Sequence, residues 1–62
     1  MYSEAEIDGN WLTLWKFDET GANIDEHEIK ISDYANVEDA LSSNGYELAG
    51  EWENGRADIW PL

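Results

Sequence analysis

Hydrophobic and polar positions alternate along two stretches of the chain and predict a β-hairpin in its first half. Residues 11–17 combine Trp, Leu, Thr and Phe, which favour strands, and leave both strand faces largely apolar. Residues 24–31 alternate more strictly, with His27 and Ile29 on one face and charged residues on the other. Such alternation is typical of a strand with one face in the core and one in water. The polar stretch 18–23, which contains a glycine, is the predicted hairpin loop.

Apolar residues then recur at helical spacing and predict one short helix. Tyr34, Val37 and Leu41 stand at i, i+3 and i+7, the stripe that an amphipathic helix turns toward a core. Asp33 or Asn36 can cap the first turn by accepting a backbone N–H bond. Because so short a helix is marginal alone, we expect its stripe to dock on the sheet.

The chain changes direction at residues 41–48, where the helix is expected to end and a strand to begin. Gly45 can adopt the left-handed conformation that stops a helix. Tyr46 then lies where a Schellman motif places an apolar contact with Leu41. The helix is therefore predicted to extend to about residue 44.

The Asn-Gly pair at residues 54–55 is a strong signal for a type I′ turn and predicts a second hairpin. A two-residue loop pairs Glu53 with Arg56. It also sets Glu51 directly opposite Asp58, a like-charge pairing that is normally destabilising. The same register predicts a set of residues on the core face: Tyr46, Leu48, Gly50, Trp52, Ala57 and Ile59.

Together these elements predict an α+β fold, ββαββ, in which a four-stranded antiparallel sheet carries one short helix packed on one face. Residues 1–9 have few bulky apolar side chains, so we interpret them as a frayed lead-in, with a short edge segment as the alternative. The chain makes a single small domain, residues 1–62. Because so small a core gains from a partner, a monomer and a swapped homodimer both stay open.

Negative charge is the abnormal feature of the composition. Fifteen Asp and Glu residues against three Lys and Arg give a formal net charge of −12. Self-repulsion of this size destabilises a compact state. Yet 42% hydrophobic and 13% aromatic residues are too many for a disordered acidic tail. We therefore expect a folded protein. Since the chain shows no membrane-length apolar run and no signal peptide, we expect it in the cytoplasm, that of the host cell if it is phage-encoded.

No arrangement of residues in the sequence indicates catalysis, a metal or a cofactor. If residues 25–28 form a strand, Asp25 and His27 share one face while the two glutamates between and after them point to the other. Too few ligands then converge for a metal site. Ser42 and Ser43 have neither a nearby His nor a nucleophile elbow. Glycosidases use paired carboxylates, but about 60 residues without long loops rarely enclose a cleft. Residues 18–25 lack the spacing of a calcium hand. We expect a non-enzyme without a cofactor.

Aromatic and acidic side chains remain as candidate binding groups. Trp52 is expected in the core. Trp11, Trp15 and Trp60 belong either to the core or to the sheet face away from the helix, where they would make an exposed apolar patch of the kind that marks an interaction surface. A protein of this charge repels phosphates, which excludes nucleic acid as a direct ligand. The expected partner is instead the basic surface of a nucleic-acid-binding protein. The predicted partner-binding residues are Glu26, Glu28, Glu38, Asp39, Glu47, Glu51, Glu53, Asp58, Trp15 and Trp60.

Residues 37–50, Val-Glu-Asp-Ala-Leu-Ser-Ser-Asn-Gly-Tyr-Glu-Leu-Ala-Gly, resemble the signature of a family of small bacterial domains of unknown function. In that family a helix ends in Gly-Trp-Glu-Leu and enters a strand, and Tyr46 stands here where the family has Trp. The resemblance implies a similar small α+β fold and brings no activity with it. In charge and size the chain is also similar to the DNA-mimicking anti-CRISPR and anti-restriction proteins of phages.

Two functions follow from these observations. The first is a small acidic inhibitor that mimics nucleic acid and occupies a basic groove on a nucleic-acid-binding protein, of the anti-CRISPR or anti-restriction type. The second is a small protein-binding module that uses an aromatic sheet face and is acidic because of its host or for solubility.

Overall fold

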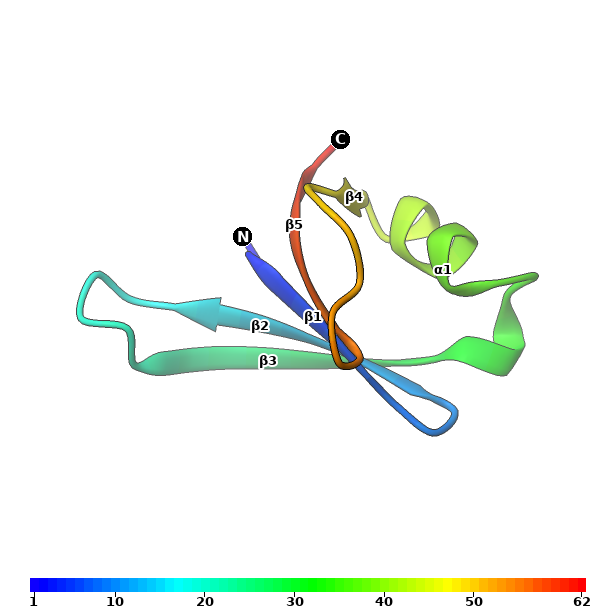
Figure 1. Cartoon of the computed structure of the whole chain (residues 1–62), viewed down its shortest axis with the longest axis horizontal. Helices are drawn as coiled ribbons and strands as arrows, with labels where there is room; N and C mark the ends of the chain where they lie inside the picture. The colour runs from blue at the N-terminus through cyan, green and yellow to red at the C-terminus, as the bar shows by residue number, and fades with distance from the viewer.

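Five antiparallel strands form one sheet in the order β3-β2-β1-β5-β4, and one short helix lies against it (Figure 1). The computed structural model describes all residues, 1–62. The strands are β1 (Glu4–Asp8), β2 (Trp11–Phe17), β3 (Asn23–Lys30), β4 (Tyr46–Leu48) and β5 (Arg56–Pro61). The helix α1 spans Val37–Ser43, and a short 3-10 turn, η1 (Ile31–Asp33), precedes it. The predicted α+β class with one short helix is confirmed.

β1 lies at the centre of the sheet, between β2 and β5, so the interpretation of residues 1–9 as a frayed lead-in is wrong. The fold has five strands in the order βββαββ, and the predicted four-stranded ββαββ is corrected accordingly. β1 turns Ala5, which has no exposed surface, toward the core. A small side chain suits this position because Ala5 lies directly between Leu14 of β2 and Ala57 of β5.

A two-residue turn leads from β1 into β2. Asp8 pairs with Trp11, which leaves Gly9 and Asn10 as the loop. Gly9 has a φ of +58° at the first loop position, where a type II′ turn places glycine. β1 and β2 therefore form a tight hairpin of their own.

Tyr2 fastens the start of the chain to the rest of the fold. Its backbone N–H donates to the hydroxyl of Tyr46 at 3.0 Å, and its own hydroxyl donates to Oδ2 of Asp25 at 3.2 Å. Its ring stacks on His27, with the ring centroids 6.1 Å apart. Burial first, and then the hydrogen bond to Asp25, raise the pKa of the Tyr2 phenol above 10.0. The residues before β1 thus belong to the folded structure.

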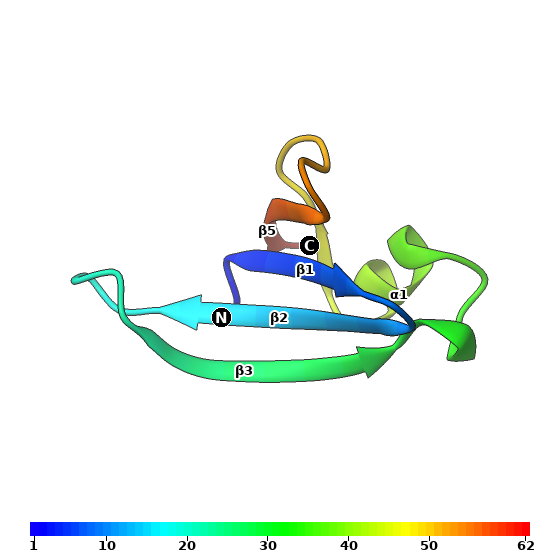
Figure 2. The same cartoon turned by 60° about the horizontal axis from the view of Figure 1, so that its bottom comes forward.

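β2 and β3 form the predicted hairpin, and the two faces of β2 are as expected. Leu12 and Leu14 are buried in the core, whereas Trp11 and Trp15 lie on the other face. The far end of this hairpin extends beyond the other strands (Figures 1 and 2). β3 is the edge strand on this side of the sheet.

The carboxylate of Asp18 organises the loop between β2 and β3. It accepts hydrogen bonds from the Thr20 hydroxyl at 2.6 Å and from the backbone N–H groups of Thr20 and Ala22 at 2.9 and 3.0 Å. These bonds, that of the Thr20 hydroxyl foremost, lower the pKa of Asp18 below its ordinary value of 3.8. The loop is therefore held by the ionised form of one side chain.

We expect the order of this loop to depend on pH in the acid range. Because the folded-state pKa of Asp18 is depressed, its contribution is complete above about pH 3.8 and is lost as the pH falls through the lower folded value. An NMR titration of the Asp18 carboxyl should give a pKa below 3.8. The Thr20→Val variant, which lacks the hydroxyl donor, should move that pKa back toward the ordinary value. An ordinary or raised pKa of Asp18 in the parent protein would contradict this role.

α1 begins and ends close to the predicted positions. Of the two candidate caps, Asn36 is the one used, and its Oδ1 accepts the backbone N–H of Asp39 at 2.7 Å. At the other end Gly45 has a φ of +89°, and its N–H donates to the carbonyl of Ser42 at 3.1 Å, one of the two bonds of a Schellman motif. The predicted left-handed stop at Gly45 is confirmed.

The core lies between α1 and one face of the sheet, as the apolar stripe of the helix predicted. Its buried residues are Ala5, Leu12, Leu14, Ile29, Ala40, Leu41 and Ile59. Tyr46 packs against this cluster and is only partly buried. Trp52, predicted to be a core residue, is likewise only partly buried at the margin of the cluster.

The last hairpin has the predicted turn. Residues 54 and 55 have φ values of +53° and +77°, as a type I′ turn requires, and Glu53 bridges to Arg56. Beyond the turn the register differs, because Leu48 of β4 pairs with Ile59 of β5. A hairpin without interruption would have paired Gly50 with that isoleucine.

Residues 50–52 account for the difference, because they leave the ladder and absorb two extra positions, whereas the Ala49 N–H still donates to the Asp58 carbonyl at 2.9 Å. The predicted opposition of Glu51 and Asp58 is therefore wrong, as are the pairings on either side of Glu51. Asp58 lies instead opposite Glu4 of β1. Trp52, at the end of the bulge, packs against the core margin.

Candidate functional site

The sheet has a second face, which α1 does not cover, and most of the predicted binding residues lie on it. We call it the outer face. Residues opposite one another in an antiparallel pair share a face, so the strand register defines its members. They are Glu4, Glu6, Asp8, Trp11, Thr13, Trp15, Glu26, Glu28, Lys30, Glu47, Arg56, Asp58 and Trp60.

Carboxylates on the outer face form two rows with β2 between them. Trp15 pairs with Glu26 of β3 on one side and with Glu4 of β1 on the other. One position along, Thr13 lies in the same way between Glu28 and Glu6. Carboxylates within a row are about 6.6–6.8 Å apart along the strand, and the rows, two strand spacings apart, are separated by roughly 9.6 Å.

Arg56 partly neutralises the row on β1. Its Nε lies 3.3 Å from Oε2 of Glu6, and its Nη1 lies 3.9 Å from Oε1 of Glu4. These are the two ion pairs of the protein, and their half-exposed side chains limit each to about 0–1 kcal/mol. The other carboxylates of the outer face have no ion-pair partner: Asp8, Glu26, Glu28, Glu47 and Asp58.

Of the two positions that the sequence left open for Trp11, Trp15 and Trp60, the structure has the one on the sheet face away from the helix, but the three rings do not form one patch. Trp11 is 45% exposed at one end of the outer face, and Trp60 is 55% exposed at the other. Trp15 lies between them and is partly buried, and its indole Nε1 is buried without a hydrogen-bond partner. Thr13 is buried beside it. The exposed rings therefore frame the carboxylate rows rather than cover them.

The structure separates the ten predicted partner-binding residues into three groups. Glu51 and Glu53 lie outside the strands, where they line a hollow of about 310 Å³ together with Glu4, Arg56 and Asp58 of the outer face. Two more residues, numbers 38 and 39, lie in the first turn of α1, away from that face. The remaining six are on the outer face: Trp15, Glu26, Glu28, Glu47, Asp58 and Trp60.

Sequence reasoning missed the acidic row on β1, which occupies the middle of the outer face. Glu4, Glu6 and Asp8 alternate with Ala5 and Ile7, a period of two that is typical of a strand with one apolar face. The prediction gave more weight to the scarcity of bulky apolar residues in this segment than to its alternation. With these three side chains, the outer face is more acidic than predicted.

Other chemistry has little support in the side-chain geometry. No three His, Cys, Asp or Glu side chains converge in a way that could hold a metal ion. His27 stacks on Tyr2 instead of facing an acidic cluster. No helix has the length and apolar character needed to cross a membrane.

The chain matched nothing in comparisons with models of protein families, with curated proteins and with solved structures.

Proposed function

We propose that the protein is a small acidic inhibitor that presents its outer face to the basic groove of a nucleic-acid-binding protein and thereby excludes nucleic acid. The observation that carries this proposal is the pair of carboxylate rows on β1 and β3. A surface of this kind is complementary to a cationic groove in charge.

The spacing of the rows supports mimicry of a nucleic-acid backbone. Each row carries a carboxylate at every second residue, so the two rows together present one charge per about 3.3–3.4 Å along the strands. One strand of a DNA duplex carries a phosphate charge per about 3.4 Å, and both strands together one per about 1.7 Å. The outer face thus reaches roughly the charge density of a single nucleic-acid strand.

The arrangement also conflicts with stability, which favours a functional reason for it. Glu4 and Asp58 are directly opposite on adjacent strands, where like charges are destabilising by roughly 0.2–1 kcal/mol. A single arginine, Arg56, is the only cation close to them. Natural proteins break such local rules mainly at functional sites, and a cationic partner would remove the conflict.

Inhibition of a purified CRISPR effector or restriction nuclease is the direct test. We expect the parent protein to release a fluorescent DNA duplex from its target and to do so less well as salt is raised. The double variant Glu26→Lys with Glu28→Lys should weaken inhibition about tenfold or more at low salt, since it reverses one row of the outer face. The matched control is Glu19→Lys with Asp33→Lys, which makes the same charge change at exposed positions outside that face.

The outcomes separate the possibilities. Equal loss of inhibition in both double variants would show that net charge alone acts and would contradict a role for the outer face. Binding that does not respond to salt would contradict mimicry. If Trp11→Ser with Trp60→Ser abolishes binding to the same target while the acidic variants bind normally, the protein is instead the aromatic binding module. The exposure of these two rings is the observation that favours that second function.

A further inference from the structure

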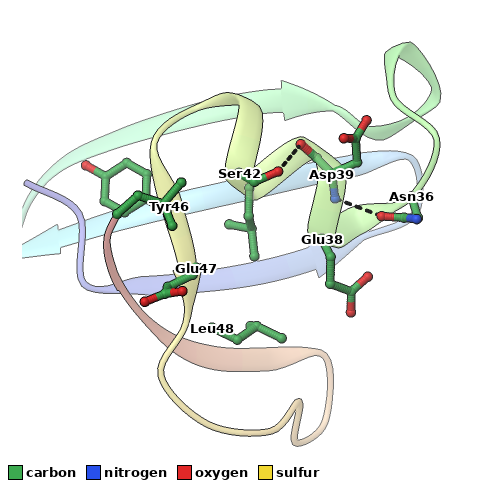
Figure 3. A pocket seen from close by; sticks show the side chains of 9 residues that line it. Asn36, Glu38, Asp39, Ser42, Tyr46, Glu47 and Leu48 are labelled. Carbon is green, nitrogen blue, oxygen red and sulfur yellow. Dashed lines mark hydrogen bonds between the residues drawn. The ribbon is translucent and has the colours of Figure 1, made fainter.

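A groove of about 450 Å³ lies between α1 and the edge strand β4 (Figure 3). We call it the α1–β4 groove. It is a small site by the standard of ligand pockets, which span roughly 300–1,000 Å³. Its lining residues are Asn36, Glu38, Asp39, Leu41, Ser42, Tyr46, Glu47, Leu48 and Leu62.

The floor of the groove is apolar and is held in place by the fold. Leu41 is buried at the centre of the core cluster, and Leu48 and Tyr46 pack against that cluster. Leu62 completes the apolar part of the lining. Its backbone N–H donates to the carbonyl of Gly45 at 2.9 Å, which holds the end of the chain beside the start of β4. A ligand's alkyl stem could therefore rest on an ordered surface.

The three carboxylates of the groove differ in what they already do. Asp39 serves the helix start, because its Oδ2 accepts the backbone N–H of Ala35 at 3.4 Å and its own N–H donates to Asn36. Glu38 and Glu47 form no ion pair and no side-chain hydrogen bond in the protein. Figure 3 shows these two carboxylates on opposite sides of Leu48, at the rim of the groove. Two free anions thus flank an apolar floor.

We infer that the α1–β4 groove receives an arginine side chain from the basic partner, an inference that rests on the proposed function for the partner's identity. The three methylenes of arginine would lie on Leu41 and Leu48, and the guanidinium would pair with Glu38 or with Glu47, whose carboxylates lie on opposite sides of Leu48. A guanidinium offers five N–H donors in a plane and is more weakly hydrated than an ammonium, and it can bind one carboxylate through two parallel N–H bonds, which lysine cannot do. Charge complementarity and the apolar floor together select this occupant.

The groove is continuous with the outer face, which explains how one partner could use both. Glu47 belongs to β4 and pairs with Trp60, so its side chain belongs to the outer face, and it also lines the groove at the edge of the sheet. A partner docked on the carboxylate rows would need only one side chain reaching around β4. The arginine would then determine how the two proteins align, because long-range charge attraction does not by itself select one alignment.

An NMR titration of backbone amides with N-acetyl-arginine amide tests the inference without a partner protein. We expect saturable shifts confined to the groove, at residues 38, 41, 47 and 48, with a dissociation constant in the millimolar range. N-acetyl-norleucine amide supplies the stem without the charge, and guanidinium chloride supplies the charge without the stem. Both should shift the same amides at least about fivefold less at equal concentration.

Matched variants complete the test. Glu38→Gln with Glu47→Gln should weaken binding of the arginine amide about tenfold, whereas Glu19→Gln with Asp33→Asn, with the same charge change at exposed positions elsewhere, should leave it unchanged. Equal binding of the norleucine amide, equal binding of a lysine amide, or non-saturating shifts over the whole acidic surface would each overturn the inference.

The two proposals can fail separately. The variant Glu26→Lys with Glu28→Lys should still bind the arginine amide in the groove, because both residues lie on the opposite edge strand. If nuclease inhibition is absent but the groove binds the arginine amide, the mimic function is wrong and the groove remains an arginine site. If the protein inhibits the nuclease but the groove does not bind the arginine amide, the inference about the groove is wrong and the proposed mimic function is unaffected.

Discussion

Removing residues 1–9 should leave a chain that does not fold. The deletion takes away β1, the strand that pairs with both β2 and β5, and so separates the sheet into two parts. It also removes Ala5 and Ile7 from the core and Tyr2 from its contacts with Tyr46. A domain of 62 residues has a total stability of only about 3–9 kcal/mol. Far-UV circular dichroism and thermal unfolding of the shortened chain should show no cooperative transition.

A pair of proline variants makes the same point without shortening the chain. Ala5→Pro removes a backbone N–H from the central strand, where proline is not tolerated, and should also abolish folding. Glu19→Pro is the control, because Glu19 is the second residue of the turn closed by the Gly21 N–H and the Asp18 carbonyl at 3.0 Å. Proline is favoured there, so stability should change little. A native spectrum for the deletion or for Ala5→Pro would show that β1 is dispensable.

β1 also shows where prediction from the sequence failed and why. The prediction weighed bulky apolar residues, and residues 1–9 have few of them. A strand held on both sides by neighbours needs no large side chain at its centre, and here Ala5 fits between Leu14 and Ala57 because it is small. The alternation of residues 4–8 and the Gly-Asn turn after it were the informative signals.

Elements governed by local chemistry were predicted well. The cap at Asn36, the left-handed Gly45 and the turn at residues 54–55 each depend on a few adjacent residues, and the structure has all three. The register of the last hairpin depends instead on the bulge at 50–52, which ends with Trp52 at the core margin. Packing between distant segments decides such a bulge, so a pattern of adjacent residues does not contain it.

The predictions for the candidate site were right where local pattern decides and wrong where pairing between distant segments decides. Because the faces of β2 and β3 follow from their alternation, Glu26, Glu28 and Trp15 were placed correctly with respect to the helix. Asp58 was expected to oppose Glu51, yet it opposes Glu4, a residue that the prediction had assigned to a frayed segment. Asp58 therefore does lie opposite a like charge, as predicted, but that charge is on β1 and not within the last hairpin.

Leu41→Ala should have the largest effect of any single truncation in the helix. Leu41 is 1% exposed and anchors α1 on the sheet, and a helix of seven residues is not stable without such docking. Replacing a buried leucine by alanine costs about 2–5 kcal/mol, out of a total of about 3–9 kcal/mol expected for a chain of this length. Urea unfolding followed by tryptophan fluorescence should therefore show a midpoint shifted far toward zero denaturant for this variant.

Ser43→Ala is the matched control for that loss, since Ser43 is exposed in the same helix and its replacement should change stability by no more than about 0.5 kcal/mol. A small effect of Leu41→Ala, similar to that of Ser43→Ala, would mean that α1 does not dock as described. The α1–β4 groove would then lose its floor, because Leu41 joins the core to the groove. The measured stability of this one variant thus decides whether an arginine side chain meets an ordered surface or a loosely held helix.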